Sequence, residues 1–214
     1  MEHALVIGAS GGIGQAMVAE LTARGVAVTG MSRSDDGLDV TDAASVARCL
    51  DGLGRFDLVF VAVGILGTPE KALAAITVEE MSRVFAVNAM GPALILRHAA
   101  ALLKPAGKVA VLSARVGSIG DNGIGGWHSY RASKAALNQI VHGAAIELGR
   151  VKKGSCVVAL HPGTVATDFT AKYAGRHKTV TPAEAARNLV NVCEALTPEQ
   201  SGGFYDYAGD VIPW

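Results

Sequence analysis

The chain alternates short apolar runs with longer segments of helical periodicity. Most of the runs are continuously apolar, as is typical of parallel strands that are covered on both faces. The runs are Leu5–Ile7, Val26–Gly30, Leu58–Val63, Lys108–Leu112, Cys156–Leu160 and Phe204–Tyr207. This alternation predicts an α/β fold, a Rossmann-type doubly wound parallel sheet with helices on both faces, formed by a single domain over residues 1–214.

Capping signals mark where several helices begin. Thr77–Glu80 and Thr181–Glu184 both read as capping boxes, and the second has proline at the first helical position. The expected helices run from Gln15 to Arg24, from about Asp42 to Leu50, from Thr77 to about Leu103, through Tyr130, and onward from Thr181. The third of these is expected to continue through a proline.

Composition narrows the class of protein. Half of the 214 residues are hydrophobic, enough for one substantial core, and basic and acidic residues both number 19. This balance argues against nucleic acid or an anionic membrane surface as partner, and no apolar stretch reaches the roughly 18 residues of a membrane span. The first residues lack the basic region of a signal peptide. Three scattered cysteines suggest free thiols in a reducing compartment, so a cytoplasmic location without a metal site is expected.

A glycine-rich segment follows the first apolar run. It reads Gly8-Ala9-Ser10-Gly11-Gly12-Ile13-Gly14 and lies between a predicted strand and a predicted helix. Strand, glycine turn and helix form the context of a dinucleotide-binding loop, because glycines allow the backbone to approach a pyrophosphate at the helix amino end. The alternative is an ordinary glycine turn between strand and helix.

Tyr130 and Lys134 form the candidate catalytic pair. Their spacing places both side chains on one helix face, one turn apart. A neighbouring positive charge is expected to lower the pKa of the phenol from its ordinary value of about 10, which suits proton exchange with a carbonyl or alcohol oxygen. On a surface helix the same spacing is usually a solvated aromatic and a solvated charge, but the glycine-rich segment favours the catalytic interpretation.

Together the two motifs resemble the short-chain dehydrogenase/reductase family over nearly the whole chain. The segments Ser113–Ile119 and Gly202–Trp214 resemble its sniffer-type carbonyl reductase and C-factor branch. The resemblance implies that the cofactor is held by Gly8, Ser10, Gly12, Ile13, Gly14, Asp39, Val40, Gly64, Tyr130, Lys134, Pro162, Gly163, Val165 and Thr167. It also implies that Asn88 is catalytic.

Pro92 gives the Asn88 assignment a physical basis. Proline has no N–H, so the Asn88 carbonyl, four residues earlier, loses its helical partner and is open to an ordered water. The resemblance implies that such a water connects to Lys134 as a proton relay. The alternative is a kink that only shapes packing.

Arg33 bears on which cofactor is bound. It follows the second predicted strand, where a guanidinium suits a 2′-phosphate, so NADP(H) is favoured. Asp35 and Asp36 lie just beyond it and keep NAD(H) as an alternative, as does the reading of Arg33 as a solvated loop charge. Asp39 would contact the adenine, although Asp39 or Thr41 could instead cap the following helix.

The serine that would bind the substrate oxygen is ambiguous. The family usually has its catalytic serine where this chain has Ala114. Ser113 is adjacent but should point to the other side if the strand continues, and Ser118 has the more usual spacing from Tyr130, so both remain candidates, with Ser118 slightly favoured.

These observations predict an NADP(H)-dependent oxidoreductase that reduces an aldehyde, ketone or quinone, or oxidises the matching alcohol. The alternative is a nucleotide-binding regulatory protein of the C-factor type with little turnover. The pocket is expected to include Ile124, Trp127, His128, Phe169 and Tyr173, beneath a short lid at residues 168–181. In many relatives the helices of Asn88 and Tyr130 form dimer faces, so the resemblance also implies contact surfaces for a homo-oligomer.

Overall fold

A six-stranded parallel sheet forms the centre of the computed structural model, which describes residues 1–171 and 179–214. The strands are β1 (His3–Ile7), β2 (Ala27–Met31), β3 (Phe56–Val61), β4 (Leu103–Leu112), β5 (Cys156–His161) and β6 (Phe204–Asp206). Their order is β2-β1-β3-β4-β5-β6, so the direction of winding reverses between β1 and β3. In sheets of this kind ligands bind at that point, beyond the carboxyl ends of the strands.

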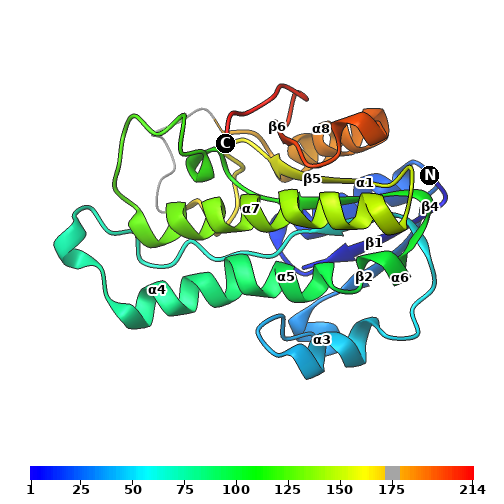
Figure 1. The fold of residues 1–214 in the computed structure, drawn as a ribbon, viewed down its shortest axis with the longest axis horizontal. Helices are drawn as coiled ribbons and strands as arrows, with labels where there is room; N and C mark the ends of the chain where they lie inside the picture. Colours follow the sequence, from blue (N-terminus) through cyan, green and yellow to red (C-terminus); the bar gives the residue numbers. More distant parts are fainter. Residues whose placement is uncertain (172–178) are drawn as a thin grey trace.

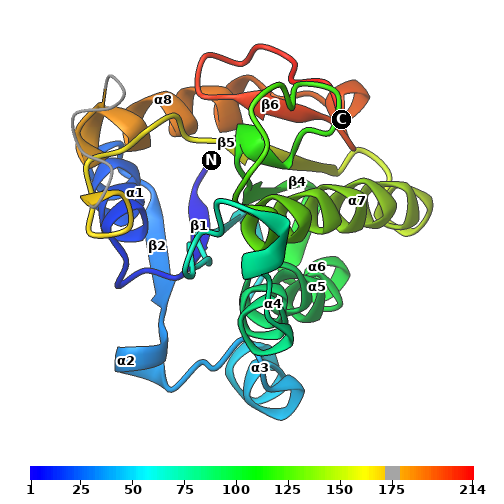
Figure 2. The ribbon, with the colours of Figure 1, turned by 90° about the vertical axis from the view of Figure 1, so that its left-hand side faces the viewer.

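Helices cover both faces of the sheet, as predicted (Figures 1 and 2). One face carries α1 (Gly12–Ala23) and α8 (Pro182–Ala195). The other carries α3 (Ala43–Leu50), α5 (Gly91–Leu96), α6 (Ala99–Leu102) and the long α7 (His128–Val151), with α4 (Val78–Phe85) packed on α7. A short helix, α2 (Arg33–Asp36), follows β2. None of the described helices is long and apolar enough to cross a membrane.

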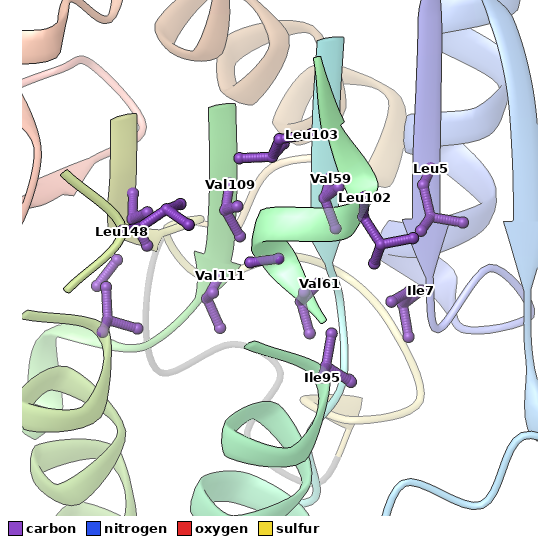
Figure 3. Close-up of a cluster of buried hydrophobic side chains, with 14 of the residues drawn as sticks. Leu5, Ile7, Val59, Val61, Ile95, Leu102, Leu103, Val109, Val111 and Leu148 are labelled. Carbon is purple, nitrogen blue, oxygen red and sulfur yellow. The ribbon is translucent and has the colours of Figure 1, made fainter. Parts of the chain in front are cut away.

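The apolar strands supply both halves of the core. Along β1, Leu5 and Ile7 belong to the cluster under α5 and α7, while Ala4 and Val6 belong to the cluster under α1 and α8. Figure 3 shows the first cluster, in which Val59, Val61, Val109 and Val111 continue the same face across β3 and β4. Two-sided burial explains why these strands read as continuously apolar.

The long helix predicted from Thr77 to Leu103 is interrupted. α4 is followed by a π-helical turn, Ala86–Met90, directly before Gly91 and Pro92 of α5. The missing proline N–H accounts for a local departure from α-helical bonding here. A second break at Arg97–His98 separates α5 from α6, and Leu103 already belongs to β4, five residues before the predicted strand. β4 has an irregular register against β3, and Ala106 adopts a φ of 58°.

The helix starts are close to those predicted. Thr77 and Thr181 accept hydrogen bonds from the backbone N–H of Glu80 and Glu184, at 3.2 and 3.1 Å. The cap of α3 is Asp42, which accepts from Ala44 N, so the suggestion that Asp39 or Thr41 caps this helix is wrong. Asp39 instead accepts from the backbone and hydroxyl of Thr41, and these bonds lower the pKa of its carboxyl.

Candidate active site

A cleft of about 840 Å³ lies at the carboxyl ends of the central strands. In Figure 1 the loops after β3 and β4 gather at the left-hand end, next to the amino end of α7. The residues lining the cleft are 10–14, 62–64, Leu66, 112–116, Trp127, Tyr130, Lys134, 161–170 and Pro182. The glycine-rich loop and the Tyr130–Lys134 pair therefore share one cavity, although 116 positions of the sequence separate Gly14 from Tyr130.

The glycine-rich loop needs glycine for steric reasons. Gly8 has a φ of +88°, and a Cβ there would lie 2.5 Å from the Ala62 carbonyl oxygen at the end of β3. A Cβ on Gly14 would overlap the Gly8 carbonyl oxygen. Because α1 begins at Gly12 and its N-cap, Gly11, has no side chain, the first N–H groups of the helix have no side-chain cap from that residue. This arrangement suits an anion such as a pyrophosphate.

The loop after β5 closes the opposite wall of the cleft. The four residues of this loop that were assigned to the cofactor all line the cleft: Pro162, Gly163, Val165 and Thr167. A Cβ on Gly12 would lie 2.7 Å from the Thr167 side chain, so this loop and the glycine-rich loop approach each other closely. Asp168 and Phe169 extend the wall, whereas Tyr173 and the centre of the expected lid lie outside the described residues.

Tyr130 and Lys134 are both buried on the face of α7 that meets the sheet. The Lys134 ammonium donates to the Leu112 carbonyl at the end of β4, at 2.9 Å. Burial lowers the pKa of Lys134 to about 7. Burial raises the pKa of Tyr130, which is the reverse of the direction expected from the neighbouring charge. Desolvation is the cause of both pKa shifts.

Asn88 ties three parts of the site together. Its Oδ1 accepts from Ile65 N at 2.7 Å, and its Nδ2 donates to Ile65 O at 2.8 Å and to Ser133 Oγ at 3.1 Å. Ser133 in turn donates to the Tyr130 carbonyl at 2.7 Å. A Cβ on Gly64 would be 3.4 Å from both Asn88 Oδ1 and Lys134 Nζ, so Gly64 lies beside both side chains. The Asn88 side chain therefore connects the segment after β3 with the turn of α7 that carries Tyr130 and Lys134.

The structure separates the two candidate serines. Ser113 lines the cleft, and its buried hydroxyl donates to Asn138 Oδ1 at 2.6 Å. Ser118 donates to the Pro213 carbonyl at 2.5 Å and accepts from Asp121 N, so it fastens the C-terminal segment. Ser118, slightly favoured from the sequence, is not among the described residues that line the cleft, so the structure gives more support to Ser113. Ala114, at the family's usual serine position, does line the cleft.

The residues assigned to the adenosine end are not among the described residues that line the large cleft. A separate cavity of about 300 Å³ is lined by Ala9, Gln15, Val18, Gly30, Asp35 and Asp36. Arg33 is the first residue of α2 and is exposed; in the sequence it precedes Asp35 and Asp36, which line this cavity. Ser32 is buried, and its hydroxyl donates to the Asp35 carboxylate. Among the described lining residues of either cavity, Arg33, Asp39 and Val40 do not appear.

Aromatic side chains flank the Tyr130 ring. Trp127 makes an edge contact at 6.2 Å between centroids, and Phe169 a tilted contact at 6.0 Å. Ile124, by contrast, is 90% exposed. Neither Ile124 nor His128 is among the described residues that line the cleft.

The sequence did not single out His161, which follows Leu160 on β5 and lines the cleft. Burial, reinforced by the charge of Arg115, lowers its pKa to about 4, so the imidazole is neutral at pH 7. Its place between an apolar strand and a proline gave no periodic signal. Ser133, Asn138 and Glu70 were also missed, because each forms a hydrogen bond with a side chain distant in sequence: Asn88, Ser113 and Ser129, respectively.

Comparisons with known proteins identify the family. Residues 8–205 match the family model described as "Enoyl-(Acyl carrier protein) reductase". The chain is 34% identical, over the full length of both proteins, to "1-hydroxy-2-glutathionyl-2-methyl-3-butene dehydrogenase" of Rhodococcus sp. (strain AD45). It is 37% identical to the "C-signal" of Myxococcus xanthus over 67% of this chain and 84% of that protein. The chain belongs to the short-chain dehydrogenase/reductase family and is an oxidoreductase.

A solved structure supports this assignment. A chain from Burkholderia multivorans, assigned to the short-chain dehydrogenases/reductases and solved with bound NADP, superposes with a TM-score of 0.86. Its sequence is 28% identical, and the match covers 100% of this chain and 99% of that one. The Rossmann-type fold predicted from the sequence is thereby confirmed.

The buried Lys134 predicts a pH dependence of stability. Its folded-state pKa of about 7 lies below the ordinary 10.5, so between these values the unfolded chain binds more protons than the folded one. The free energy of unfolding should therefore rise with pH in this window, by up to about 1.4 kcal/mol per pH unit from this residue. Lys134→Met should lack this contribution, and denaturant titrations between pH 7.5 and 9.5 measure it.

The exposed Lys71 provides the control, since Lys71→Met should retain the wild-type slope. Parallel pH profiles of the free energy of unfolding for wild type and Lys134→Met would show that burial does not lower the pKa of Lys134.

Proposed function

We propose that the chain is an NADP(H)-dependent reductase of carbonyl compounds, or a dehydrogenase of the matching alcohols. The observation that carries the proposal is the shared cleft: a glycine loop shaped for a pyrophosphate and a buried Tyr130–Lys134 pair face one cavity. Neither feature alone would suffice, because glycine turns and buried tyrosines are common. Together they supply a nucleotide site and a proton donor within one cavity.

The cofactor would extend along the carboxyl ends of the strands. The glycine loop would hold the pyrophosphate at the start of α1, and Gly64, Lys134 and the 162–167 loop would hold the nicotinamide half. Asp39 and Val40 would lie against the adenine, and Arg33 would meet the 2′-phosphate. The Burkholderia relative with bound NADP supports this choice of cofactor.

The residues of the cleft have distinct chemical roles in the proposed reaction. The bound cofactor supplies a hydride to the carbonyl carbon. Tyr130 donates its phenolic proton to the carbonyl oxygen, so the product is the alcohol. A protonated Lys134 lowers the pKa of Tyr130 during this transfer, and the Asn88 turn anchors the water through which the proton is replaced. For alcohol oxidation the same groups act in reverse.

Ser113 is the proposed hydroxyl for the substrate oxygen. In the structure its proton is engaged by Asn138 Oδ1, while Asn138 Nδ2 is buried without a partner in the described part of the chain. Rotating the Asn138 amide by half a turn would let Nδ2 donate to Ser113 Oγ and release the serine proton toward the cleft. Ser113 would then donate to the substrate carbonyl, although position 114 has an alanine and no hydroxyl.

The walls around Tyr130 favour an apolar substrate. Leu66, Val116, Trp127 and Phe169 line this part of the cleft, and the two aromatic rings flank the phenol. A planar aldehyde, ketone or quinone would stack against them. No partner other than such a small molecule is needed for the activity.

A regulatory function is the second candidate. The Myxococcus relative is named "C-signal", and Ala114 replaces the usual catalytic serine in this chain. In that case the protein would bind the nucleotide tightly but turn over little.

The setting of the protein is part of the proposal. Cys49, Cys156 and Cys193 are free thiols, which suits a reducing compartment such as the cytoplasm. The exposed Met90 and Ile146, beside α5 and on α7, are apolar residues through which a homo-oligomer would pack.

The proposed reaction is tested with NADPH that carries deuterium at its transferable position, mixed with benzaldehyde, acetophenone or menadione. Wild type should place deuterium on the carbinol carbon of the alcohol that forms from benzaldehyde or acetophenone. Tyr130→Phe should lower kcat by about a hundredfold to ten-thousandfold, because it removes only the proton donor, and should keep its affinity for the nucleotide. Tyr205→Phe removes a buried phenol outside the cleft and should keep the wild-type rate.

Wild-type turnover by Tyr130→Phe would contradict the proposed acid. Tight nucleotide binding by wild type, without oxidation of NADPH by any of the three compounds, would favour the regulatory alternative.

Cofactor preference is tested at Arg33. Wild type should bind NADPH at least about tenfold more tightly than NADH, a difference of roughly 1.4 kcal/mol, because the guanidinium pairs with the additional phosphate. Arg33→Ala should lose most of this preference, whereas Arg150→Ala, an exposed arginine at the far end of α7, should retain it. Fluorescence titration gives both dissociation constants, and equal affinities in wild type would rule out the assigned preference.

A further inference from the structure

The amino end of α7 needs a cap from outside the helix. The residue at its N-cap is Trp127, whose indole can donate but cannot accept a hydrogen bond, so it cannot satisfy the helix N–H groups. Trp127 and the two preceding glycines all have φ values between 53° and 70°. Tyr130 lies only two residues after the first residue of α7, so the placement of this end sets the placement of the phenol.

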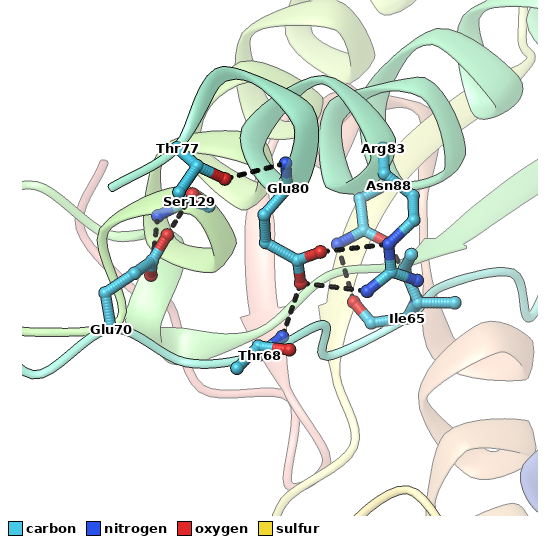
Figure 4. Close-up of polar contacts among 8 residues, drawn as sticks. All are labelled: Ile65, Thr68, Glu70, Thr77, Glu80, Arg83, Asn88 and Ser129. Atoms are coloured by element: carbon cyan, nitrogen blue, oxygen red, sulfur yellow. Dashed lines mark hydrogen bonds and ion pairs between the residues drawn. The ribbon is translucent and has the colours of Figure 1, made fainter. Parts of the chain in front are cut away.

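Glu70 supplies this cap from the loop after β3. Its carboxylate accepts from Ser129 N at 3.2 Å and makes a short hydrogen bond with the Ser129 hydroxyl, and its carbonyl accepts from Trp127 N at 2.6 Å. Glu70 is only 5% exposed, and Figure 4 shows its carboxylate beside Ser129. Glu70 and Ser129 are 59 residues apart in the sequence.

The cap is charged as well as buried. Burial alone would raise the pKa of Glu70, but the hydrogen bonds from Ser129 and the nearby charge of His128 bring it below its ordinary value. An ionised carboxylate at a helix amino end is stabilised by the helix dipole and by the first N–H groups.

The loop that carries Glu70 is itself fixed to the site. At its start, Ile65 makes two backbone hydrogen bonds with the Asn88 side chain. In its middle, Thr68 N donates to Glu80 Oε1 at 2.5 Å, and Arg83 pairs with the same carboxylate at 2.8 Å (Figure 4). Residues 65–70 thus form a strap that joins the Asn88 turn to the first turn of α7.

We propose that Glu70 is a positioning residue for Tyr130: its carboxylate holds the first turn of α7 so that the phenol meets the substrate oxygen. The inference builds on the proposed role of Tyr130 as proton donor. Glu70 is not among the described residues that line the cleft, so it would act through Ser129 and Trp127. Misplacing a reacting group by about 1 Å can cost a hundredfold in rate, so the effect should be visible in turnover.

Three variants test the inference. Glu70→Ala removes the acceptor, and kcat for the best of the three carbonyl compounds should fall about tenfold to a hundredfold with little change in nucleotide affinity. Glu70→Gln keeps an acceptor of the same size and should restore most of kcat. The exposed Glu79→Gln, on the first turn of α4, should match wild type.

A pH profile and hydrogen exchange extend the test. In Glu70→Gln the pH limb of alcohol oxidation should move to lower pH, because a negative charge near Tyr130 is removed while the cap remains. Amide exchange over residues 128–132 should accelerate in Glu70→Ala and not in Glu79→Gln, and this measurement does not depend on turnover.

The outcomes separate the two proposals. If wild type and Glu70→Ala reduce the substrate within twofold of each other, or if exchange over residues 128–132 is unchanged, Glu70 does not position Tyr130. If wild type shows no turnover but exchange responds as expected, the cap stands and the proposed reaction fails. Should Glu70→Ala not fold, Ser129→Ala, which removes the hydroxyl and keeps the N–H, must lower kcat more than it weakens nucleotide binding, or the inference is overturned.

Discussion

The site depends on the burial of two ionisable side chains, Tyr130 and Lys134, on the face of one helix against the ends of parallel strands. The Lys134 ammonium donates to the carbonyl of Leu112, the last residue of β4, at 2.9 Å. Burial drives the lysine toward its neutral form and the phenol toward its protonated form. Both pKa shifts arise because α7 excludes water from the two side chains.

Holding such a pair in place requires supports from several directions. Asn88 reaches Ser133 from the π-helical turn before Pro92, Asn138 bonds Ser113 at the end of β4, and Glu70 caps the first turn of α7. Each support is a buried polar group whose hydrogen bonds are made with the helix or with a strand end. Side chains far from one another in sequence therefore fix a site whose chemistry is confined to a few atoms.

The sequence predicted the parts of the molecule that depend on local signals. Continuous apolar runs gave the parallel sheet, threonine caps gave the starts of α4 and α8, and the glycine loop and the tyrosine–lysine spacing gave the family. What it could not give depends on the folded chain. Ser118 had the more usual spacing from Tyr130, but its hydroxyl donates to the Pro213 carbonyl. Glu70 has no local sequence feature that pairs it with Ser129. The pKa of Tyr130 was expected to fall because a neighbouring charge is visible in sequence and burial is not.

If the proposed function is correct, burial keeps Tyr130 protonated when no cofactor is bound, and a bound, charged cofactor lowers its pKa for catalysis. The direct measurement is the phenolate absorption of wild type minus that of Tyr130→Phe, titrated with and without NADP⁺. Without NADP⁺, Tyr130 should not ionise below the free-phenol value of about 10, and with NADP⁺ bound it should ionise below that value. Ionisation below that value without NADP⁺ would show that burial does not keep Tyr130 protonated, and identical titrations with and without NADP⁺ would show that the bound cofactor does not lower its pKa.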